Sequence, residues 1–585
     1  MRQTPGCRDN DQGGDNMGRL ERVRRRLLFA ILAGTLVAGV SASTASSAGP
    51  DPLRKINHIV VIYEENHSFD NLYGGWEGVN GLANADRAHT AQVDQAGVEY
   101  ACLKQLDVNL TFPGTCQDAT HGITNSAFTN NWFTIDNFIP ATATTCPKGS
   151  QAFSFPNGIK DGARDAAGNL IGLPGGCTRD LVHKFYQEQY QLNGGAQNRY
   201  MVGSDAAGTV MGVYDTKALP IYRYLHQANH SHYAIADNFF QAAFGGSFLN
   251  HQWLIAARTP WDDNAPANLH SLVDSAGFPR NNYPLYVPMP GVTYKDSDFT
   301  VTCPAPKAGL ACGNFAVNTM QPTNEPFGTF GEKLVVQNHA TIGDRLTGSG
   351  IDWAWYSGGW SNAAGNVDAP GWTNGSGPTC SDPNHDTNAT FHYPKCPDFV
   401  FQFHHQPFAY FAAYAPGMPG RSHLRDEVEF MDAAKSSGRQ CNLKAVSFVK
   451  PLGQENEHPG YASEPNGSNH LVDLLQMIDG SACAKDTMVI VTYDEFGGQW
   501  DHVPPPGQAG GPSAPHDDMG PGTRIPALVI APGLSGNFVV DHTPYDTTSI
   551  LATIEHRYGL RPLWQRDAAV NDLSTVWDGK QVPAG

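Results

Sequence analysis

The sequence predicts an α/β fold with a mainly parallel sheet, helices on both faces and a long loop-rich insertion. Short β-branched runs alternate with helical patterns along the 585 residues, as they do when parallel strands are joined by helical crossovers. Two of those runs end directly in neighbouring carboxylates. The composition, 40% apolar and only 16% charged, is typical of a globular chain with a large buried core.

The first 50 residues have the pattern of a secretory signal peptide. Four arginines between positions 22 and 26 precede an apolar run, Leu27–Val40, and small residues follow, with Ser46–Ala48 as a cleavage site. A membrane anchor is the alternative, but the run is short for a bilayer span and contains Gly34 and Gly39. We therefore expect residues 1–48 to be removed and the protein to be secreted or periplasmic, with no stable membrane insertion.

The remaining chain, residues 51–570, is expected to form one domain. Four short apolar runs predict buried strands and three amphipathic stretches predict helices. The stretch 258–330 is rich in Pro, Asn and Gly and has little periodicity, so we interpret it as an insertion or lid. The predicted strands are Ile56–Tyr63, Lys444–Lys450, Thr487–Tyr493 and Ile525–Ile530, and the predicted helices are Leu219–Gln227, Asn469–Ile478 and Ser549–Tyr558.

The cysteines agree with export. Eleven are present, and ten remain once Cys7 is lost with the leader. An even number fits disulfides in an oxidising compartment, whereas a structural zinc site is disfavoured because no Cys-x-x-Cys occurs. Pairing of consecutive cysteines, which would close short loops, is our working hypothesis: Cys102–Cys116, Cys146–Cys177, Cys303–Cys312, Cys380–Cys396 and Cys441–Cys483.

The charge balance excludes one class of partner. The chain has 38 Lys plus Arg against 56 Asp plus Glu, a net charge of −18. Nucleic-acid binding requires clustered cations that displace counterions from phosphates, so we expect no nucleic-acid partner. An anionic membrane surface is disfavoured for the same reason.

The ends of two predicted strands carry candidate metal ligands. Glu65 and Asn66 follow the first strand, and Asp494 and Glu495 follow the strand that ends at Tyr493. Ligands of open α/β sheets bind beyond the carboxyl ends of the strands, and adjacent carboxylates repel one another unless a cation lies between them. Oxygen donors suit a hard divalent cation. The alternative interpretation is that these are solvated loop charges.

Four histidines stand out by their local setting. His404 and His405 are adjacent in an aromatic segment, His458 lies in the polar turn NEHPG, and His121 lies in the polar segment QDATHGI. Imidazoles gathered in a cleft can hold a phosphate, protonate a leaving group or bind a metal. Taken singly, each of them is also compatible with an ordinary surface or packing role.

Ser247 is the candidate nucleophile. It follows a Gly-Gly turn that can present its hydroxyl at the junction of a strand and a helix. The turn is not the nucleophile elbow of carboxylesterases, because Leu249 occupies the place of the second glycine. A Ser-His-Asp hydrolase of the α/β-hydrolase type is therefore disfavoured.

With these residues identified, the chain resembles the bacterial phosphoesterase family of secreted acid phosphatases and non-haemolytic-type phospholipases C. That family belongs to the alkaline-phosphatase-like superfamily, whose fold the resemblance implies. The resemblance runs discontinuously from about Asn57 to Leu560. The most specific segments that carry it are YEENHSFDNLYG and VTYDEFGGQWDHVPPP, with support from the FGGSFLNH, HHQPFAYF and NEHP segments.

The resemblance implies a role for each candidate residue. It implies one divalent cation, held by Glu65, Asn66, Asp494 and Glu495, with Ser247 as a fifth ligand and nucleophile. It also implies that four histidines surround the phosphate: His404, His405, His458 and, by a less direct match, His121.

The expected function is that of a secreted metal-dependent phosphoric-ester hydrolase, phosphatase-like, that acts on a small phosphate ester through a phosphoserine intermediate. The cation is expected to be Mg, Ca, Mn or Zn, because oxygen ligands accept all four. Serine at the nucleophile favours a monoesterase, since the family's phospholipases usually have threonine there. A phospholipase C acting on phosphocholine lipids is the alternative, and a non-catalytic metal- or anion-binding protein is a more distant one.

Overall fold

The computed structural model describes residues 51–105, 114–141, 178, 180–227, 232–266, 269–271, 313–328, 331–372, 401–453, 455–461, 463–534 and 538–582. The predicted signal peptide, residues 1–48, and most of the predicted insertion, residues 258–330, lie outside these ranges. Among the described residues, no helix combines the length and the apolar character needed to cross a membrane.

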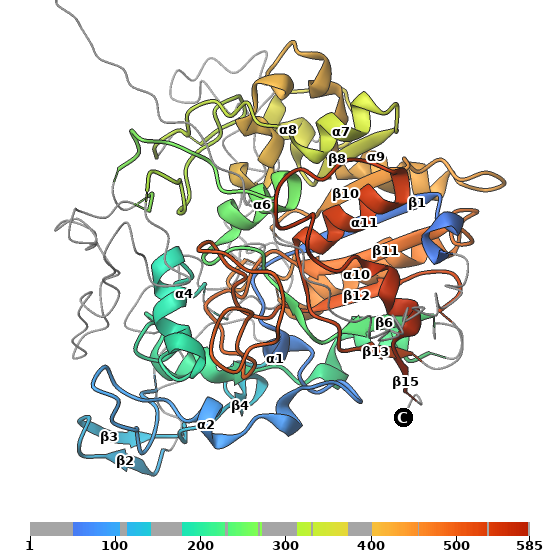
Figure 1. The fold of residues 1–585 in the computed structure, drawn as a ribbon. Coiled ribbons are helices and arrows are strands. Elements are labelled where there is room, and N and C mark those ends of the chain that lie inside the picture. The colour runs from blue at the N-terminus through green and yellow to red at the C-terminus, as the bar shows by residue number, and fades with distance from the viewer. Residues whose placement is uncertain are drawn as a thin grey trace, which may run out of the picture. The chain divides into compact units, whose positions relative to one another are not determined.

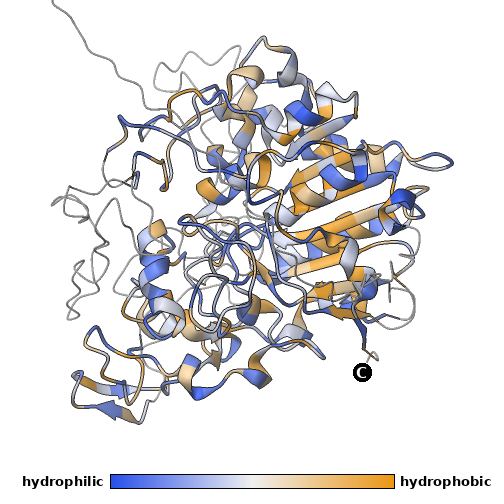
Figure 2. Ribbon diagram, in the orientation of Figure 1, coloured by the Kyte–Doolittle hydropathy of each residue, from blue (hydrophilic) through white to orange (hydrophobic). Residues whose placement is uncertain are grey.

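A large sheet forms the centre of the described structure (Figure 1). Its strands are mostly short, and the central ones are buried along nearly their whole length, in agreement with their hydrophobic colouring in Figure 2. From one edge to the other, the strands are β15 (Lys580–Gln581), β13 (Val539–Asp541), β6 (Tyr233–Ala236), β12 (Ala527–Ile530), β11 (Thr487–Tyr493), β1 (His58–Glu64), β10 (Val446–Lys450), β8 (Trp353–Ser357) and β9 (Leu424–Asp426).

The prediction of a mainly parallel sheet is confirmed. Strands β11, β1, β10, β8 and β9 are parallel to one another. Strand β12 is the main departure, because it runs antiparallel to both β11 and β6. The loop between β11 and β12, residues 494–526, therefore starts and ends at the same edge of the sheet.

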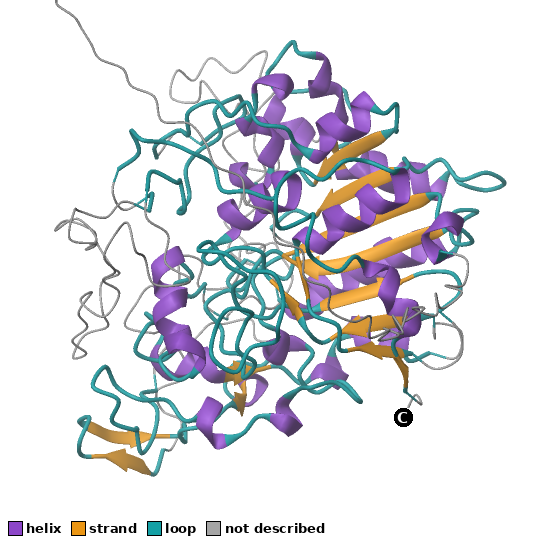
Figure 3. Ribbon diagram, in the orientation of Figure 1, coloured by secondary structure: helices purple, strands orange, loops and turns teal. Residues whose placement is uncertain are grey.

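Helices cover both faces of the sheet (Figure 3). Consecutive residues of a strand point to opposite faces: the Tyr63 hydroxyl reaches the Asn250 carbonyl of α6 at 3.4 Å, whereas the Glu64 carboxylate is influenced by charged groups of α9 and α10. The Tyr63 side carries α6 (Ser247–Ala256), which packs against α7 (Ile342–Gly348) and α11 (Thr548–Tyr558). The Glu64 side carries α9 (Glu427–Lys435) and α10 (Glu464–Asp479), and α10 contacts α5 (Pro220–Leu225).

Smaller elements surround this core. They are α1 (Phe69–Leu72), α2 (Arg87–Thr90), α4 (Phe185–Leu192) and α8 (Trp360–Ala364), together with the strand pairs β2 (Cys116–Asp118) with β3 (Ile123–Ser126), β4 (Phe133–Thr134) with β5 (Gly212–Val213), and β7 (Phe239–Phe240) with β14 (Tyr545–Asp546).

Two of the hypothesised disulfides are present. Cys102–Cys116 and Cys441–Cys483 both pair, with Cα atoms 6.0 and 4.7 Å apart. The cysteines of the other three hypothesised pairs lie outside the described residues. Consecutive pairing is thus confirmed where the structure describes both partners.

Candidate active site

The two carboxylate-bearing strand ends lie side by side. Strands β1 and β11 are parallel neighbours in a register that pairs Glu64 with Tyr493, so the residues that follow them emerge at the same edge. The Asn66 N–H donates to Asp494 Oδ1 at 3.1 Å, and Asn66 has a positive φ of 59°. A Cβ atom at Gly497 would lie 2.3 Å from the Asn66 carbonyl oxygen, so glycine is required for this close approach.

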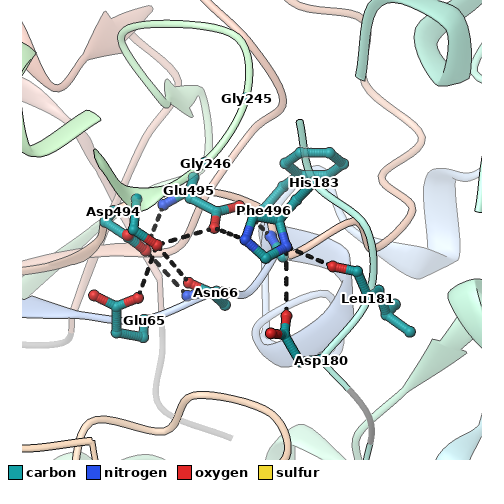
Figure 4. Close-up of polar contacts among 12 residues, drawn as sticks. Glu65, Asn66, Asp180, Leu181, His183, Gly245, Gly246, Asp494, Glu495 and Phe496 are labelled. Atoms are coloured by element: carbon teal, nitrogen blue, oxygen red, sulfur yellow. Dashed lines mark hydrogen bonds and ion pairs between the residues drawn. The ribbon is translucent and has the colours of Figure 1, made fainter. Parts of the chain in front are cut away.

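Ser247 lies against these strand ends. It is the first residue of α6, and its hydroxyl lies 3.1 Å from Glu65 Oε2 and 3.4 Å from both Asn66 Oδ1 and Glu495 Oε1. Asp494, Glu495 and Asn66 face one another beside Glu65 in Figure 4. The structure thus brings together all five residues that the resemblance implies as metal ligands.

The loop before Ser247 is held by side chains. The Gly245 N–H donates to Glu188 Oε2 at 2.5 Å, and the other carboxylate oxygen of Glu188 accepts hydrogen bonds from Thr523. The Asn250 side chain bonds the backbone of Ala243 through both its oxygen and its nitrogen. These contacts fix the loop that presents the Ser247 hydroxyl.

Three of the four predicted histidines lie at or beside this cluster. His405 Nε2 is 3.2 Å from Glu65 Oε1, and the ring of His404 packs edge-on against that of His405. His458 Nδ1 donates to the Pro459 carbonyl, so its Nε2 accepts from the Asn66 amide at 3.0 Å. The Asn66 amide oxygen is thereby turned towards Ser247.

The fourth predicted histidine lies elsewhere. His121 follows β2, where its Nδ1 bonds Asp118 at 2.7 Å and its ring packs against that of Tyr100 at an angle of 34°. Within the described part of the chain, no contact joins His121 to the Ser247 cluster. The histidine upstream of Ser247 that does reach the cluster is His183, whose Nε2 is 3.3 Å from Glu495 Oε1.

Three residues of the cluster were missed from sequence. Figure 4 shows His183 between Asp180 and Glu495. The Lys450 ammonium, at the end of β10, is buried, pairs with Glu65 and donates to the Tyr63 carbonyl at 2.8 Å. His251, one helical turn after Ser247, donates from Nδ1 to the Ser247 carbonyl at 2.8 Å.

The electrostatics of the cluster reflect crowded buried carboxylates. Burial, and then the neighbouring Asp494, raises the pKa values of Glu65 and Glu495 well above their usual range. Burial also raises the pKa of Asp494, an effect that Lys450 opposes. Three carboxylates therefore face a single lysine, which leaves an excess of negative charge that a cation would stabilise.

The residues fit a divalent cation. Asp494 Oδ2 and His251 Nε2 are buried and make no hydrogen bond with any described residue, whereas Glu65 Oε1 is in the ion pair with Lys450. Carboxylate, amide and imidazole groups are common ligands of divalent cations. Glu65, His251 and His405 also place one ligand atom each within 4.8 Å of the others.

Burial disfavours the charged forms of the neighbouring imidazoles. Burial lowers the pKa of His404 to about 3, with Lys450 contributing. Burial also lowers the pKa values of His405 and His458 well below the usual range. A phosphate bound beside these rings would favour their protonated forms.

A cavity of about 510 Å³ adjoins Ser247, which is in the size range of small-molecule sites. Gly246 and Phe248, on either side of Ser247 in the sequence, contribute to its wall together with His183. The remainder of the lining is mixed, with apolar groups beside polar and charged ones: Asp180, Leu181, Val182, Lys184, Asp205, Leu269, Val317, Asn318 and Thr319.

The chain is similar to named phospholipases C over part of its length. Phospholipase C B of Mycobacterium tuberculosis is 34% identical over 166 residues, which are 25% of this chain and 31% of the relative. Non-specific phospholipase C6 of Arabidopsis thaliana is 29% identical over 160 residues, 23% of this chain and 30% of the relative. The chain therefore spans about a third of the length of these relatives.

Solved structures show only distant likeness. A phosphonate monoester hydrolase of Agrobacterium radiobacter matches with a TM-score of 0.26 and 10% identity, over 62% of this chain and 72% of that chain. A protein in the alkaline phosphatase superfamily from Vibrio parahaemolyticus matches with a TM-score of 0.20 and 15% identity, over 40% of this chain and 51% of that chain.

A protein-family model matches most of the chain. The sequence model of the Phosphoesterase family matches residues 56–146 and 163–561. These ranges contain both strand ends, Ser247 and the clustered histidines. The chain therefore belongs to the Phosphoesterase family.

Proposed function

We propose that this protein is a metal-dependent phosphoric-ester hydrolase that forms a phosphoserine intermediate at Ser247. The observation that carries the proposal is the position of the Ser247 hydroxyl, within 3.4 Å of oxygens from Glu65, Asn66 and Glu495. A protein that only binds a metal or an anion has no need of a hydroxyl at this point, which argues against the non-catalytic alternative.

Glu65, Asn66, Asp494 and Glu495 are the residues that would hold the cation, together with Ser247. A divalent cation bound there supplies Lewis-acid chemistry: it favours ionisation of the serine hydroxyl and offsets the charge of the phosphate. His458 contributes by orienting the Asn66 amide, since its Nε2 accepts from the amide nitrogen at 3.0 Å.

The chain's own residues carry the reaction in two steps. Ser247 Oγ loses its proton to solvent and attacks phosphorus, the bond to the leaving oxygen breaks, and that oxygen takes a proton from an imidazolium, which we assign to the partly exposed His404. Water then attacks the phosphoserine and gives a proton back to His404. The bond between phosphorus and Ser247 Oγ breaks, and Oγ takes up a proton from solvent as phosphate leaves. Lys450 and the N–H groups of the first turn of α6, which have no acceptors within the helix, stabilise the charge on the phosphoryl oxygens.

Phosphate monoesters are the preferred substrate class in this proposal, because the nucleophile is a serine. A phospholipase C activity is the second candidate, and it is supported by the relatives that are named phospholipases C. The cavity next to Ser247, with Leu181, Val182 and Phe248 in its wall, suits a leaving group with an apolar part in either case.

We also propose that the mature protein is exported. The disulfides Cys102–Cys116 and Cys441–Cys483 suit an oxidising compartment. The expected cleavage after residue 48 can be checked by N-terminal sequencing of the protein recovered outside the cytoplasm.

A substrate panel tests the proposed activity. We expect 4-nitrophenyl phosphate to be hydrolysed with a kcat/KM at least about tenfold above that for bis(4-nitrophenyl) phosphate or phosphatidylcholine vesicles, and we expect EDTA to abolish turnover by removing the cation. The same preparation of a Ser247→Ala variant controls for contaminating phosphatases. Preferential hydrolysis of phosphatidylcholine would establish the phospholipase C alternative, and no hydrolysis of any ester with Mg²⁺, Ca²⁺, Mn²⁺ or Zn²⁺ present would reject the proposal.

A further inference from the structure

The two glutamates at the end of β1 serve opposite faces of the sheet. Glu65 reaches Ser247, as described above. Glu64 is the last residue of β1, and its side chain lies on the face covered by α9 and α10, opposite to that of Tyr63. Glu64 is fully buried, and neither of its carboxylate oxygens has a hydrogen-bond partner among the described residues. An ionised carboxylate without donors is costly to bury, so Glu64 needs a cation or a proton.

Three further ligand-type side chains gather on this face. Glu427 is the first residue of α9, His470 lies within α10, and Glu455 lies in the loop after β10. One ligand atom from each lies within 4.8 Å of the others. His470 Nε2 is 2.9 Å from Glu427 Oε1, and His470 Nδ1 is 4.0 Å from Glu455 Oε2. The Glu455 side chain is 34% exposed, which gives the cluster access to solvent.

The buried Glu64 belongs to the same electrostatic environment. Burial and then the nearby Glu457 raise the pKa of its carboxyl, whereas Lys450 and then His470 lower it. Burial opposes a charged imidazole at His470, yet Glu427, Glu455 and Glu64 raise its pKa to about 9. The Lys450 ammonium is shared, because it also pairs with Glu65 in the Ser247 cluster. Among the described residues, the carboxylates of Glu64, Glu427, Glu455 and Glu457 therefore face one imidazole and one shared ammonium.

We infer that Glu427, Glu455 and His470 form a second cation site, near the buried Glu64 and distinct from the Ser247 cluster. Carboxylates together with an imidazole suit a divalent transition metal such as Mn²⁺ or Zn²⁺ better than Mg²⁺, which prefers oxygen and water ligands. A cation bound there links α9, α10 and the loop after β10 to the end of β1. It would thus stabilise the strand end from which Glu65 and Asn66 continue into the Ser247 cluster.

Metal stoichiometry tests this site without reference to turnover. The full mature chain is dialysed against MnCl₂ or ZnCl₂, and bound metal is counted. The proteins compared are the wild type, Asp494→Asn, the double variant Glu427→Gln/Glu455→Gln, and the triple variant that combines all three substitutions. We expect two cations per wild-type chain, one in Asp494→Asn, one in the double variant and none in the triple variant. Glu429→Gln is the matched control, because Glu429 also lies on α9 but pairs with Arg425, and it should bind as wild type does.

Glu455→Gln alone guards against misfolding, because Glu455 is partly exposed. This single change is expected to weaken binding of one cation at least about tenfold. In a separate measurement, added metal should raise the melting temperature of Asp494→Asn but not that of the triple variant. The inference is overturned if Asp494→Asn binds no cation or if the triple variant binds as much as Asp494→Asn. Because bound metal is the readout, an inactive protein would reject the proposed function without affecting this result.

Discussion

Alanine at position 247 is expected to lower kcat/KM for the best phosphate ester by about four orders of magnitude or more. The physical reason is that the variant has no nucleophile: the Ser247 hydroxyl is the group that the buried oxygens of Glu65, Asn66 and Glu495 surround. Losses of this size are typical when a nucleophile is removed. The measurement is steady-state turnover under conditions that saturate the wild-type protein with metal.

Two comparisons make that result interpretable. Ser247 is a small side chain at the start of α6, so the alanine variant should keep the melting temperature of the wild type within a few degrees. Ser247→Thr retains a hydroxyl and should keep measurable turnover. Near-normal activity in Ser247→Ala would remove this residue from the nucleophile role.

Asparagine at position 494 is expected to be the next most damaging change. Turnover should fall about a thousandfold, and the protein should bind the metal more weakly. Asp494 Oδ1 accepts from the N–H groups of Asn66 and Glu495, while Oδ2 makes no hydrogen bond with a described residue. The change removes one of the three negative charges that face the expected cation. Turnover is measured as the metal concentration is raised, and high metal should partly restore it.

The matched control for this change is Asp473→Asn. Asp473 is an exposed residue of α10, so the same loss of one charge should leave both turnover and its metal dependence unchanged. Equal activity of wild type and Asp494→Asn at every metal concentration would contradict the assignment of Asp494 as a ligand.

Much of the central sheet could be predicted because its strands are continuous apolar runs. The predicted strand at Thr487–Tyr493 has the bounds of β11, and β10 and β12 lie within their predicted ranges. Strand β1 begins two residues later than predicted and extends one residue further, to Glu64. The strands of this sheet that were missed, β6, β8, β9, β13 and β15, have between two and five residues, too few to show a clear period. The direction of β12 depends on where the loop 494–526 ends, which is a property of tertiary structure.

The residues of the candidate site could also be predicted only in part, where they lie next to a recognisable element. Glu65, Asn66, Asp494 and Glu495 could be identified because each pair directly follows a recognisable strand. Lys450 and His251 carried weaker signals, the first as a charge at the end of a buried strand and the second as a residue one turn from Ser247 on the predicted strand-to-helix junction. His183 had no local signal, because only tertiary contacts bring it to Glu495.

Acid quenching during turnover tests the central claim most directly. Wild-type protein is mixed with a ³²P-labelled monoester, quenched within the first turnovers, digested and analysed by mass spectrometry. The account predicts phosphate esterified to the peptide that contains Ser247, and none on that peptide in Ser247→Ala. Release of phosphate with no phosphorylated protein, or label found on a histidine instead, would contradict it.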